Sequence, residues 1–266
     1  MIICDTNIWY DIGDGTISWE KVKKLPLTST ILSIQELLNS PNLIDRADNV
    51  RGAVAAIKAF RRQILVNPFL LGILRFEPQY PVAIEVEGGQ KEWENIKTLL
   101  HTQINIPEED RAAMREIRNE YTNAKDIKSL TEFFNEKSKE VRQYLETNNL
   151  EQERMEMDYA PHFKKNISDL LMQYHLDSNK EFTVEIQPTS DCWNDLELIT
   201  EMWAAYSKEF DISQKTTPRK IRDNDWVDIL NAFYVGRNDL YWTKDKYCLD
   251  LMNANPKMKK YMFELN

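Results

Sequence analysis

Four carboxylates stand at places in the sequence where a folded α/β chain would bring them together. Asp5 and Asp245 each follow a short apolar run, while Glu36 and Asp228 lie in helical segments that neighbour such runs. Ligands of parallel α/β sheets collect beyond the carboxyl ends of the strands, so we expect these side chains in one cleft. Clustered carboxylates repel one another unless a cation neutralises them. Oxygen ligands without a nearby His or Cys favour Mg²⁺ or Mn²⁺.

Short apolar patterns in the N-terminal sequence predict the elements that would position Asp5 and Glu36. Residues 1–4 are apolar and end at a polar stop, which is typical of a buried parallel strand that meets a loop. A second extended stretch is predicted from Leu27, after a proline. It runs into apolar residues at helical spacing between positions 31 and 38, which place Glu36 on a short helix.

The C-terminal part returns to the same alternation of strands and helices. Apolar residues alternate with polar ones at 182–186 and predict a strand. Asn224 or Asp225 is expected to cap the helix that carries Asp228. Residues 240–243 predict a last short strand, followed by a C-terminal helix. Strands that alternate with helices at both ends of the chain predict an α/β fold with a mainly parallel sheet flanked by helices.

The middle of the chain has a different character. Apolar residues at positions 50, 54, 57, 60 and 64 follow a helical stripe, and only residues 80–86 are predicted to be extended. No Gly/Ser-rich linker bounds this region. We therefore predict an α/β core made of residues 1–42 and 181–266, interrupted by a long, mainly helical insertion at 43–180.

The acidic segments together resemble the PIN-domain ribonucleases. The segments that carry the resemblance are Asp5-Thr6-Asn7, Ile34-Gln35-Glu36-Leu37-Leu38, Asn224-Asp225-Trp226-Val227-Asp228 with Ile229-Leu230-Asn231-Ala232, and Leu240-Tyr241-Trp242-Thr243-Lys244-Asp245. Their order and surroundings match those of the family. The insertion is far longer than the compact form of the family allows.

The resemblance implies a fold, an activity and a set of roles. It implies a PIN-like core that hydrolyses phosphodiester bonds with the help of Mg²⁺ or Mn²⁺, which lowers the pKa of a bound water. Asp5 and Asp228 would be the principal metal ligands. Glu36 and Asp245 would complete the catalytic site directly or through water.

The resemblance also implies a supporting set of polar residues. Asn7 and Thr243 would orient the metal ligands, as residues behind a metal site do. Asp225, one helical turn before Asp228 on the same face, would support the site as well.

Each acidic residue also has an ordinary structural explanation. Asp5 alone would be a turn residue or a helix cap. Glu36 alone would be a solvated helix residue, and Asp225 is as readily a helix cap as a ligand. Asp239 is expected to be a turn residue before the last strand. Only the joint pattern favours a site, most strongly at Asp5 and Asp228.

The charge of the chain bears on its substrate. A net charge of −9 does not fit a protein that coats nucleic acid with basic surface. A local basic cluster, Arg219, Lys220 and Arg222, precedes the helix of Asp228 and would contact substrate phosphates beside the metal. The alternative is a solvated loop. The partner expected from this interpretation is nucleic acid, with single-stranded RNA favoured.

The cysteines and the apolar runs bear on the compartment. The three cysteines are scattered and odd in number, which argues against a disulfide framework and for a reducing compartment. The N-terminus has no basic start or small-residue cleavage site, and no apolar run approaches the roughly 20 residues of a membrane span. We expect a cytoplasmic protein with no membrane association.

Two other functions stay open at the level of sequence. The first is a non-catalytic binding module that keeps the fold while the insertion recruits a protein or RNA partner. The second is the toxin of a toxin–antitoxin pair, although this chain is longer than such toxins usually are. The four acids favour the enzyme, whereas the acidic net charge and the large insertion favour the module.

Overall fold

A computed structural model of the chain describes residues 1–76, 83–98, 190–213 and 223–265, with a few isolated positions between 143 and 172. The predicted strand at 182–186 and the basic cluster at 219–222 lie outside the described residues. In chain order the described elements are β1 (Ile2–Cys4), α1 (Thr6–Gly13), α2 (Trp19–Val22), β2 (Leu27–Thr30), α3 (Ile31–Leu38), α4 (Asn42–Asp45), α5 (Ala47–Phe60), β3 (Gln63–Ile64), α6 (Pro68–Phe76), α7 (Ala83–Thr98), α12 (Ser190–Asp195), α13 (Glu197–Ser213), α14 (Asp223–Asn231), η1 (Ala232–Tyr234), β4 (Leu240–Trp242), α15 (Lys246–Ala254) and α16 (Pro256–Lys259).

The strands form one parallel sheet in the order β3-β2-β1-β4. The central strand β1 pairs with both ends of the chain, since Ile2 lies opposite Leu27 on one side and Leu240 on the other. The predicted α/β class is confirmed at this level. Because all four strands run the same way, their carboxyl ends meet at one edge of the sheet, and α1 and α3 both begin there.

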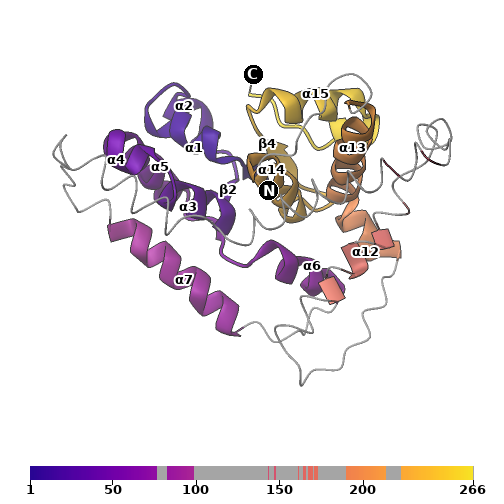
Figure 1. The fold of residues 1–266 in the computed structure, drawn as a ribbon. Coiled ribbons are helices and arrows are strands. Elements are labelled where there is room, and N and C mark those ends of the chain that lie inside the picture. Colours follow the sequence, from indigo (N-terminus) through magenta and orange to yellow (C-terminus); the bar gives the residue numbers. More distant parts are fainter. Residues whose placement is uncertain are drawn as a thin grey trace.

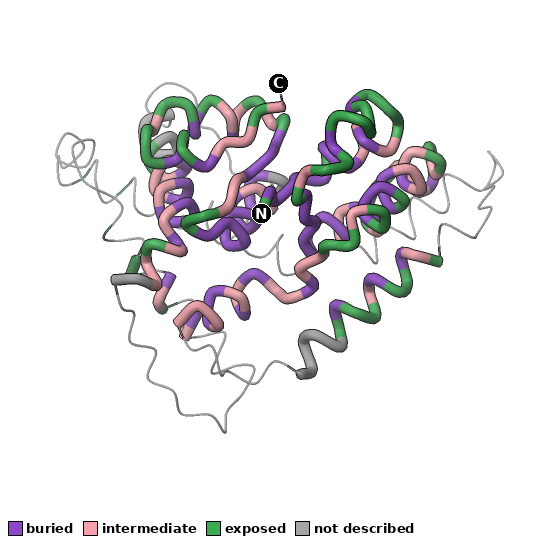
Figure 2. The backbone as a smooth tube through the Cα atoms, turned by 180° about the vertical axis from the view of Figure 1, so that it is seen from behind, coloured by how far each residue is buried: buried purple, intermediate pink, exposed green. Residues whose placement is uncertain are grey.

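Helices cover the sheet on both sides and enclose its core. Figure 1 shows α1 to α5 grouped beside β2, with α13, α14 and α15 grouped beside β4. The buried stretches run through the strands and the helix faces next to them (Figure 2). The largest fully buried side chains include Trp9, Ile34, Leu37, Phe233 and Tyr234. Burial of each such side chain contributes roughly 1.5–3 kcal/mol before the entropy cost of ordering it.

A glycine pair sets the distance between two of the helices. A Cβ atom on Gly13 of α1 would lie 2.3 Å from the carbonyl carbon of Gly52 on α5. Real side-chain atoms do not approach a backbone this closely, so only glycine lets α1 and α5 touch here. This contact fixes α1, which begins immediately after Asp5.

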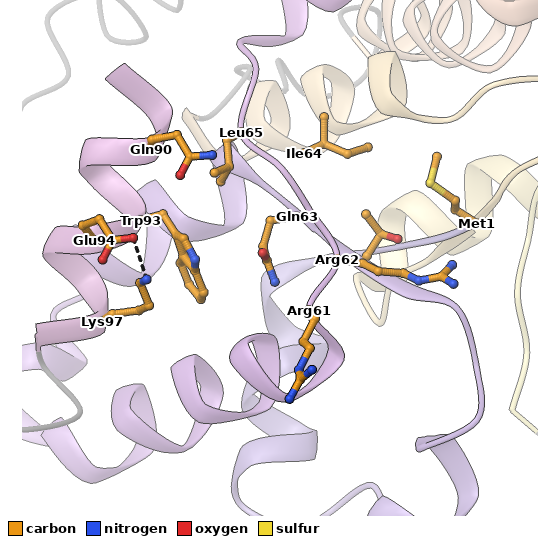
Figure 3. A pocket seen from close by; sticks show the side chains of 11 residues that line it. Met1, Arg61, Arg62, Gln63, Ile64, Leu65, Gln90, Trp93, Glu94 and Lys97 are labelled. Carbon is orange, nitrogen blue, oxygen red and sulfur yellow. Dashed lines mark hydrogen bonds and ion pairs between the residues drawn. The ribbon is translucent and has the colours of Figure 1, made fainter. Parts of the chain in front are cut away.

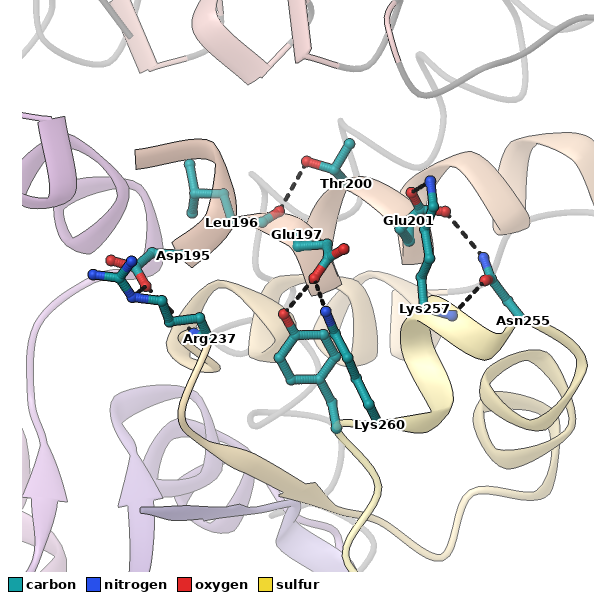
Figure 4. Close-up of polar contacts among 10 residues, drawn as sticks. Asp195, Leu196, Glu197, Thr200, Glu201, Arg237, Asn255, Lys257 and Lys260 are labelled. Carbon is teal, nitrogen blue, oxygen red and sulfur yellow. Dashed lines mark hydrogen bonds and ion pairs between the residues drawn. The ribbon is translucent and has the colours of Figure 1, made fainter. Parts of the chain in front are cut away.

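Ionic and aromatic contacts position α14 through α13. Glu197 on α13 accepts a hydrogen bond from the Tyr261 hydroxyl at 2.7 Å and forms an ion pair with Lys260 (Figure 4). In the core, the rings of Trp203 on α13 and Trp226 on α14 meet edge to face at 5.7 Å. Both rings are buried, as is usual for tryptophans that lie among apolar residues. These contacts hold α14, and with it Asp228, beside the sheet.

Two sequence predictions about the middle region are wrong. The helical stripe stops at Phe60, because Arg61 adopts a left-handed backbone conformation with φ 55°. The next residues join the sheet instead, and Ile64 belongs to β3, which pairs with β2. Residues 83–86, predicted to be extended, form the first turn of α7, since an apolar run this short does not distinguish a strand from a helix.

The predicted cap of α14 is also wrong. The helix begins at Asp223, so Asn224 and Asp225 lie inside it. Asp225 and Trp226 are both buried, and this packing keeps the first turn helical. The sheet takes its edge strand, β3, from the range predicted to be a helical insertion, while the division of the chain into core and insertion stays a prediction.

None of the helices in the described ranges is long and apolar enough to cross a membrane.

Candidate active site

Asp5 lies at the carboxyl end of the central strand. Its backbone N–H donates to the carbonyl oxygen of Trp242 at 2.9 Å, which extends the pairing of β1 and β4 by one step. Its side chain then caps α1, because Oδ1 accepts the Thr6 N–H at 2.7 Å. The predicted cap and the predicted site position are thus the same residue.

The second oxygen of Asp5 is held by the residues that the sequence predicts as its support. Oδ2 accepts hydrogen bonds from Asn7 Nδ2 at 3.3 Å and from Thr243 Oγ1 at 3.1 Å. Burial raises the pKa of Asp5, whereas the hydrogen bonds from Thr6, Thr243 and Asn7 act in the opposite direction. These donors fix the orientation of a carboxylate that is only 4% exposed.

Glu36 lies on α3, and its side chain extends to the start of α1 beside Asp5. Its Oε2 accepts a hydrogen bond from the Thr6 hydroxyl. Burial and, after it, the charge of Asp5 raise the pKa of Glu36 to about 7. Sequence reasoning gave Thr6 no role of its own. The signal available was its place directly after Asp5, at the start of a helix where its hydroxyl faces the cluster.

Asp228 is the least satisfied of the four carboxylates. It accepts no hydrogen bond from any residue in the described part of the chain, and it is half-buried. The pKa of Asp228 is raised to about 9. Burial is the largest cause, and the charges of Asp5, Asp245, Glu36 and Asp225 add to it. All the other acids of the predicted site are therefore close enough to act on Asp228.

The helix that carries Asp228 is tied to the sheet one turn further on. Asn231, fully buried, accepts a hydrogen bond through Oδ1 from the Thr30 hydroxyl at 3.0 Å. Thr30 ends β2 and caps α3 by accepting the Ser33 N–H at 3.2 Å. One buried threonine thus sets the positions of both α3, with Glu36, and α14, with Asp228.

Asp245 caps α15 and contacts the same cluster. Its Oδ1 accepts the Cys248 N–H at 2.7 Å, and its backbone N–H donates to Thr243 Oγ1 at 3.0 Å. Thr243 therefore links Asp5 and Asp245 through one hydroxyl. Asp239, in contrast, is a turn residue as predicted, with the Gly236 N–H at 3.1 Å and the N-terminal ammonium at 2.6 Å.

Two buried phenols lie beside the carboxylates. The hydroxyls of Tyr206 on α13 and Tyr241 on β4 have no hydrogen-bond partner in the described residues. Burial raises the pKa of both phenols, and the charge of Asp228 adds to this effect on each. Both therefore stay neutral and are available as hydrogen-bond donors near the cluster. Their position depends on tertiary packing, and no local pattern in the sequence marks them.

The four carboxylates are ligands of the kind that a hard cation prefers, but their side chains are not yet grouped as a metal-binding site. As the side chains stand, no three acidic, His or Cys residues of the described ranges form a group that could hold a metal ion. However, Asp228 has no hydrogen-bond donor among the described residues, and the like charges around it oppose its ionisation. A divalent cation would relieve both problems, and carboxylate oxygens are the ligands that Mg²⁺ and Mn²⁺ prefer. The residues present therefore fit such an ion in kind.

Compared with known protein families, with curated proteins and with solved structures, the chain shows no significant match.

Proposed function

We propose that the chain is a metal-dependent nuclease with a PIN-like core and that its substrate is RNA. The observation that carries the proposal is the environment of Asp228, a half-buried carboxylate without a hydrogen-bond donor among the described residues and under the charges of Asp5, Glu36 and Asp245. Repulsion of this kind costs stability unless the cluster serves to hold a cation. The order of the acids along the chain supports the family resemblance.

The side chains divide into ligands and supports. Asp5 and Asp228 would hold Mg²⁺ or Mn²⁺ directly, with Glu36 and Asp245 directly or through water. When bound, the metal would supply charge for the phosphate and lower the pKa of a water molecule. Asn7 and Thr243 orient the Asp5 carboxylate through Oδ2.

The hydrogen bond from Thr6 has a consequence for Glu36. It occupies Oε2 and fixes the side-chain rotation, so that Oε1 is the oxygen available to the cluster. A pKa of about 7 in the metal-free protein lets this carboxyl hold or release a proton near neutral pH. The fixed rotation and the balanced protonation suit a residue that binds through water.

A non-catalytic binding module is the second candidate. It is favoured by the absence of a ready three-ligand group in the described part of the chain and by the net charge of −9. In this case the fold would be kept for its surface, and a protein or RNA partner would be recruited by the residues between the two halves of the core.

Cleavage assays distinguish the two candidates. Wild-type protein with Mn²⁺ is expected to cut labelled single-stranded RNA, and EDTA is expected to stop it. Asp228→Asn keeps the shape of the side chain but removes its charge, so cleavage should fall by about 100-fold or more, a loss comparable to that of one preorganised charge-stabilising group.

The matched control is Asp250→Asn, since Asp250 is an exposed acid on α15 and the change in net charge is the same. This variant should cut at the wild-type rate. Wild-type protein that cuts neither RNA nor DNA with Mg²⁺ or Mn²⁺, yet binds RNA, would favour the binding module.

A further inference from the structure

Two buried hydroxyls near the acidic cluster have no hydrogen-bond partner. Tyr206 is 4% exposed and Tyr241 is 1% exposed, and neither hydroxyl bonds to any residue in the described part of the chain. Buried polar atoms of folded proteins nearly always have a partner, and a buried hydroxyl without one costs stability. Two such hydroxyls in one region of the fold therefore call for an explanation beyond packing.

Each phenol is held in place by its surroundings. Tyr241 lies in the middle of β4, where its N–H donates to the Tyr261 carbonyl at 2.6 Å and its own carbonyl accepts the Phe263 N–H at 2.9 Å. The ring of Tyr206, on α13, packs edge to face against Tyr247 with 5.1 Å between the ring centroids. Because both rings are fixed, each hydroxyl is presented from one position, and its acceptor has to lie there.

The hollow beside β3 does not supply this acceptor. It has a volume of about 630 Å³ and is lined by Met1, by Thr28, by residues 61–65 and by one face of α7 (Figure 3). Neither tyrosine lines it. Both hydroxyl oxygens are closed off from solvent, so we look for their acceptor among the groups of the protein itself.

Asp228 is the carboxylate of the cluster with room for these donors. The other three, Asp5, Glu36 and Asp245, each accept at least one hydrogen bond. Asp228 accepts none from the residues that the structure describes. Its charge acts on both phenols, so the carboxylate is a neighbour of both. An acceptor without donors thus lies near two donors without acceptors.

We propose that Tyr206 and Tyr241 are positioning residues of the metal site, whose hydroxyls donate hydrogen bonds to the Asp228 carboxylate when a cation is bound. The proposal rests on the proposed function, because it takes Asp228 as a metal ligand. A carboxylate that binds a metal through one oxygen leaves the other for hydrogen-bond donors, and such donors fix its orientation. Hydrogen bonds from a hydroxyl to a carboxylate are about twice as strong as those between neutral groups.

Mn²⁺ binding and urea unfolding of the full chain together test the proposal. Tyr206→Phe and Tyr241→Phe each remove one hydroxyl and keep the ring. In calorimetric titration each variant should bind Mn²⁺ about 10-fold or more weakly than wild type. In EDTA neither variant should unfold at a lower urea concentration than wild type, because the hydroxyl that it lacks has no partner in the metal-free chain.

Tyr234→Phe is the matched control. Tyr234 is as deeply buried as Tyr241, but its hydroxyl donates to the Val66 carbonyl at 2.8 Å. Burial raises the pKa of this phenol without a contribution from any carboxylate of the described residues. The variant leaves a carbonyl unpaired, so its urea midpoint should fall while its Mn²⁺ affinity stays at the wild-type value. The control and the two test variants should therefore give opposite results.

The outcomes separate this proposal from the proposed function. If wild type binds no Mn²⁺, the metal site is refuted and the role of the tyrosines with it. If wild type binds Mn²⁺ and both test variants keep its affinity, the metal site stands and the role of the tyrosines is overturned. It is also overturned if affinity falls only together with the urea midpoint, as for a residue that merely packs. Weaker binding at unchanged stability in either variant supports the donor role of that tyrosine.

Discussion

The repulsion within the acidic cluster predicts how the metal-free protein responds to pH. The pKa of Asp228 is about 9 in the folded chain and has its ordinary value of 3.8 when the chain is unfolded. Between these values the folded state binds a proton that the unfolded state does not. The contribution of Asp228 to stability is therefore fully present below about pH 4 and is lost as the pH rises through about 9. Asparagine at this position does not titrate, so Asp228→Asn should lack this loss.

The size of the effect follows from linkage. One proton difference changes the free energy of unfolding by about 1.4 kcal/mol per pH unit, and the slope flattens near the folded pKa. Without solvent screening, the titration of Asp228 would lower the free energy of unfolding by about 2 kcal/mol from about pH 7 to about pH 9. Asp228 is half-buried, and solvent screens part of the repulsion, so we expect that wild type loses about 1–2 kcal/mol more than Asp228→Asn.

Urea unfolding in EDTA at both pH values measures this difference. Asp250→Asn serves as the control, because it removes the same charge from an exposed position and should follow wild type. If the unfolding free energies of wild type and Asp228→Asn run parallel from the lower to the higher pH, Asp228 does not lie within the field of the other carboxylates. In that case the reasoning about the site is wrong.

Further predictions concern single contacts. Thr6→Val keeps the shape but removes the hydroxyl that fixes Glu36, so Mn²⁺ affinity measured by titration should fall about 10-fold or more. An unchanged affinity would mean that Thr6 only packs. Gly13→Ala places a Cβ against the backbone of Gly52 and should destabilise the fold by about 2 kcal/mol or more in urea unfolding. Gly88→Ala on α7 meets no atom within 4 Å and should instead be neutral or stabilising by up to about 1 kcal/mol; equal destabilisation by the two would contradict the close-contact argument.

The predictable parts of the fold were those with a local signal. Residues 1–4 and 240–243 are short apolar runs with polar stops, and the structure places β1 and β4 there. Asp245 could be expected to begin a helix, because an acid directly before a helical pattern is a common cap. These features depend on near neighbours in the chain, which a single sequence displays.

The missed parts depend on distant contacts. β3 has two residues and no pattern of its own, and it exists because β2 offers an unpaired edge and Arg61 ends the helix before it. The contact of Thr6 with Glu36 joins residues 30 positions apart. The close approach of α7 to the segment after β3, where a Cβ on Gly89 would lie 2.0 Å from the Leu65 carbonyl oxygen, is likewise predicted by no periodicity in the sequence.

The two explanations of the acidic residues, helix cap and metal ligand, turn out to be compatible. Asp5 caps α1 with Oδ1, and Asp245 caps α15 with Oδ1, which in each case leaves the other oxygen for the cluster. The N-termini of the two helices carry partial positive charge, and this charge offsets part of the repulsion between the carboxylates. Asp228 lies within α14 and has neither a cap nor a donor among the described residues. Its ionisation therefore depends on a bound cation, and its replacement should separate a nuclease from a protein that only keeps the fold.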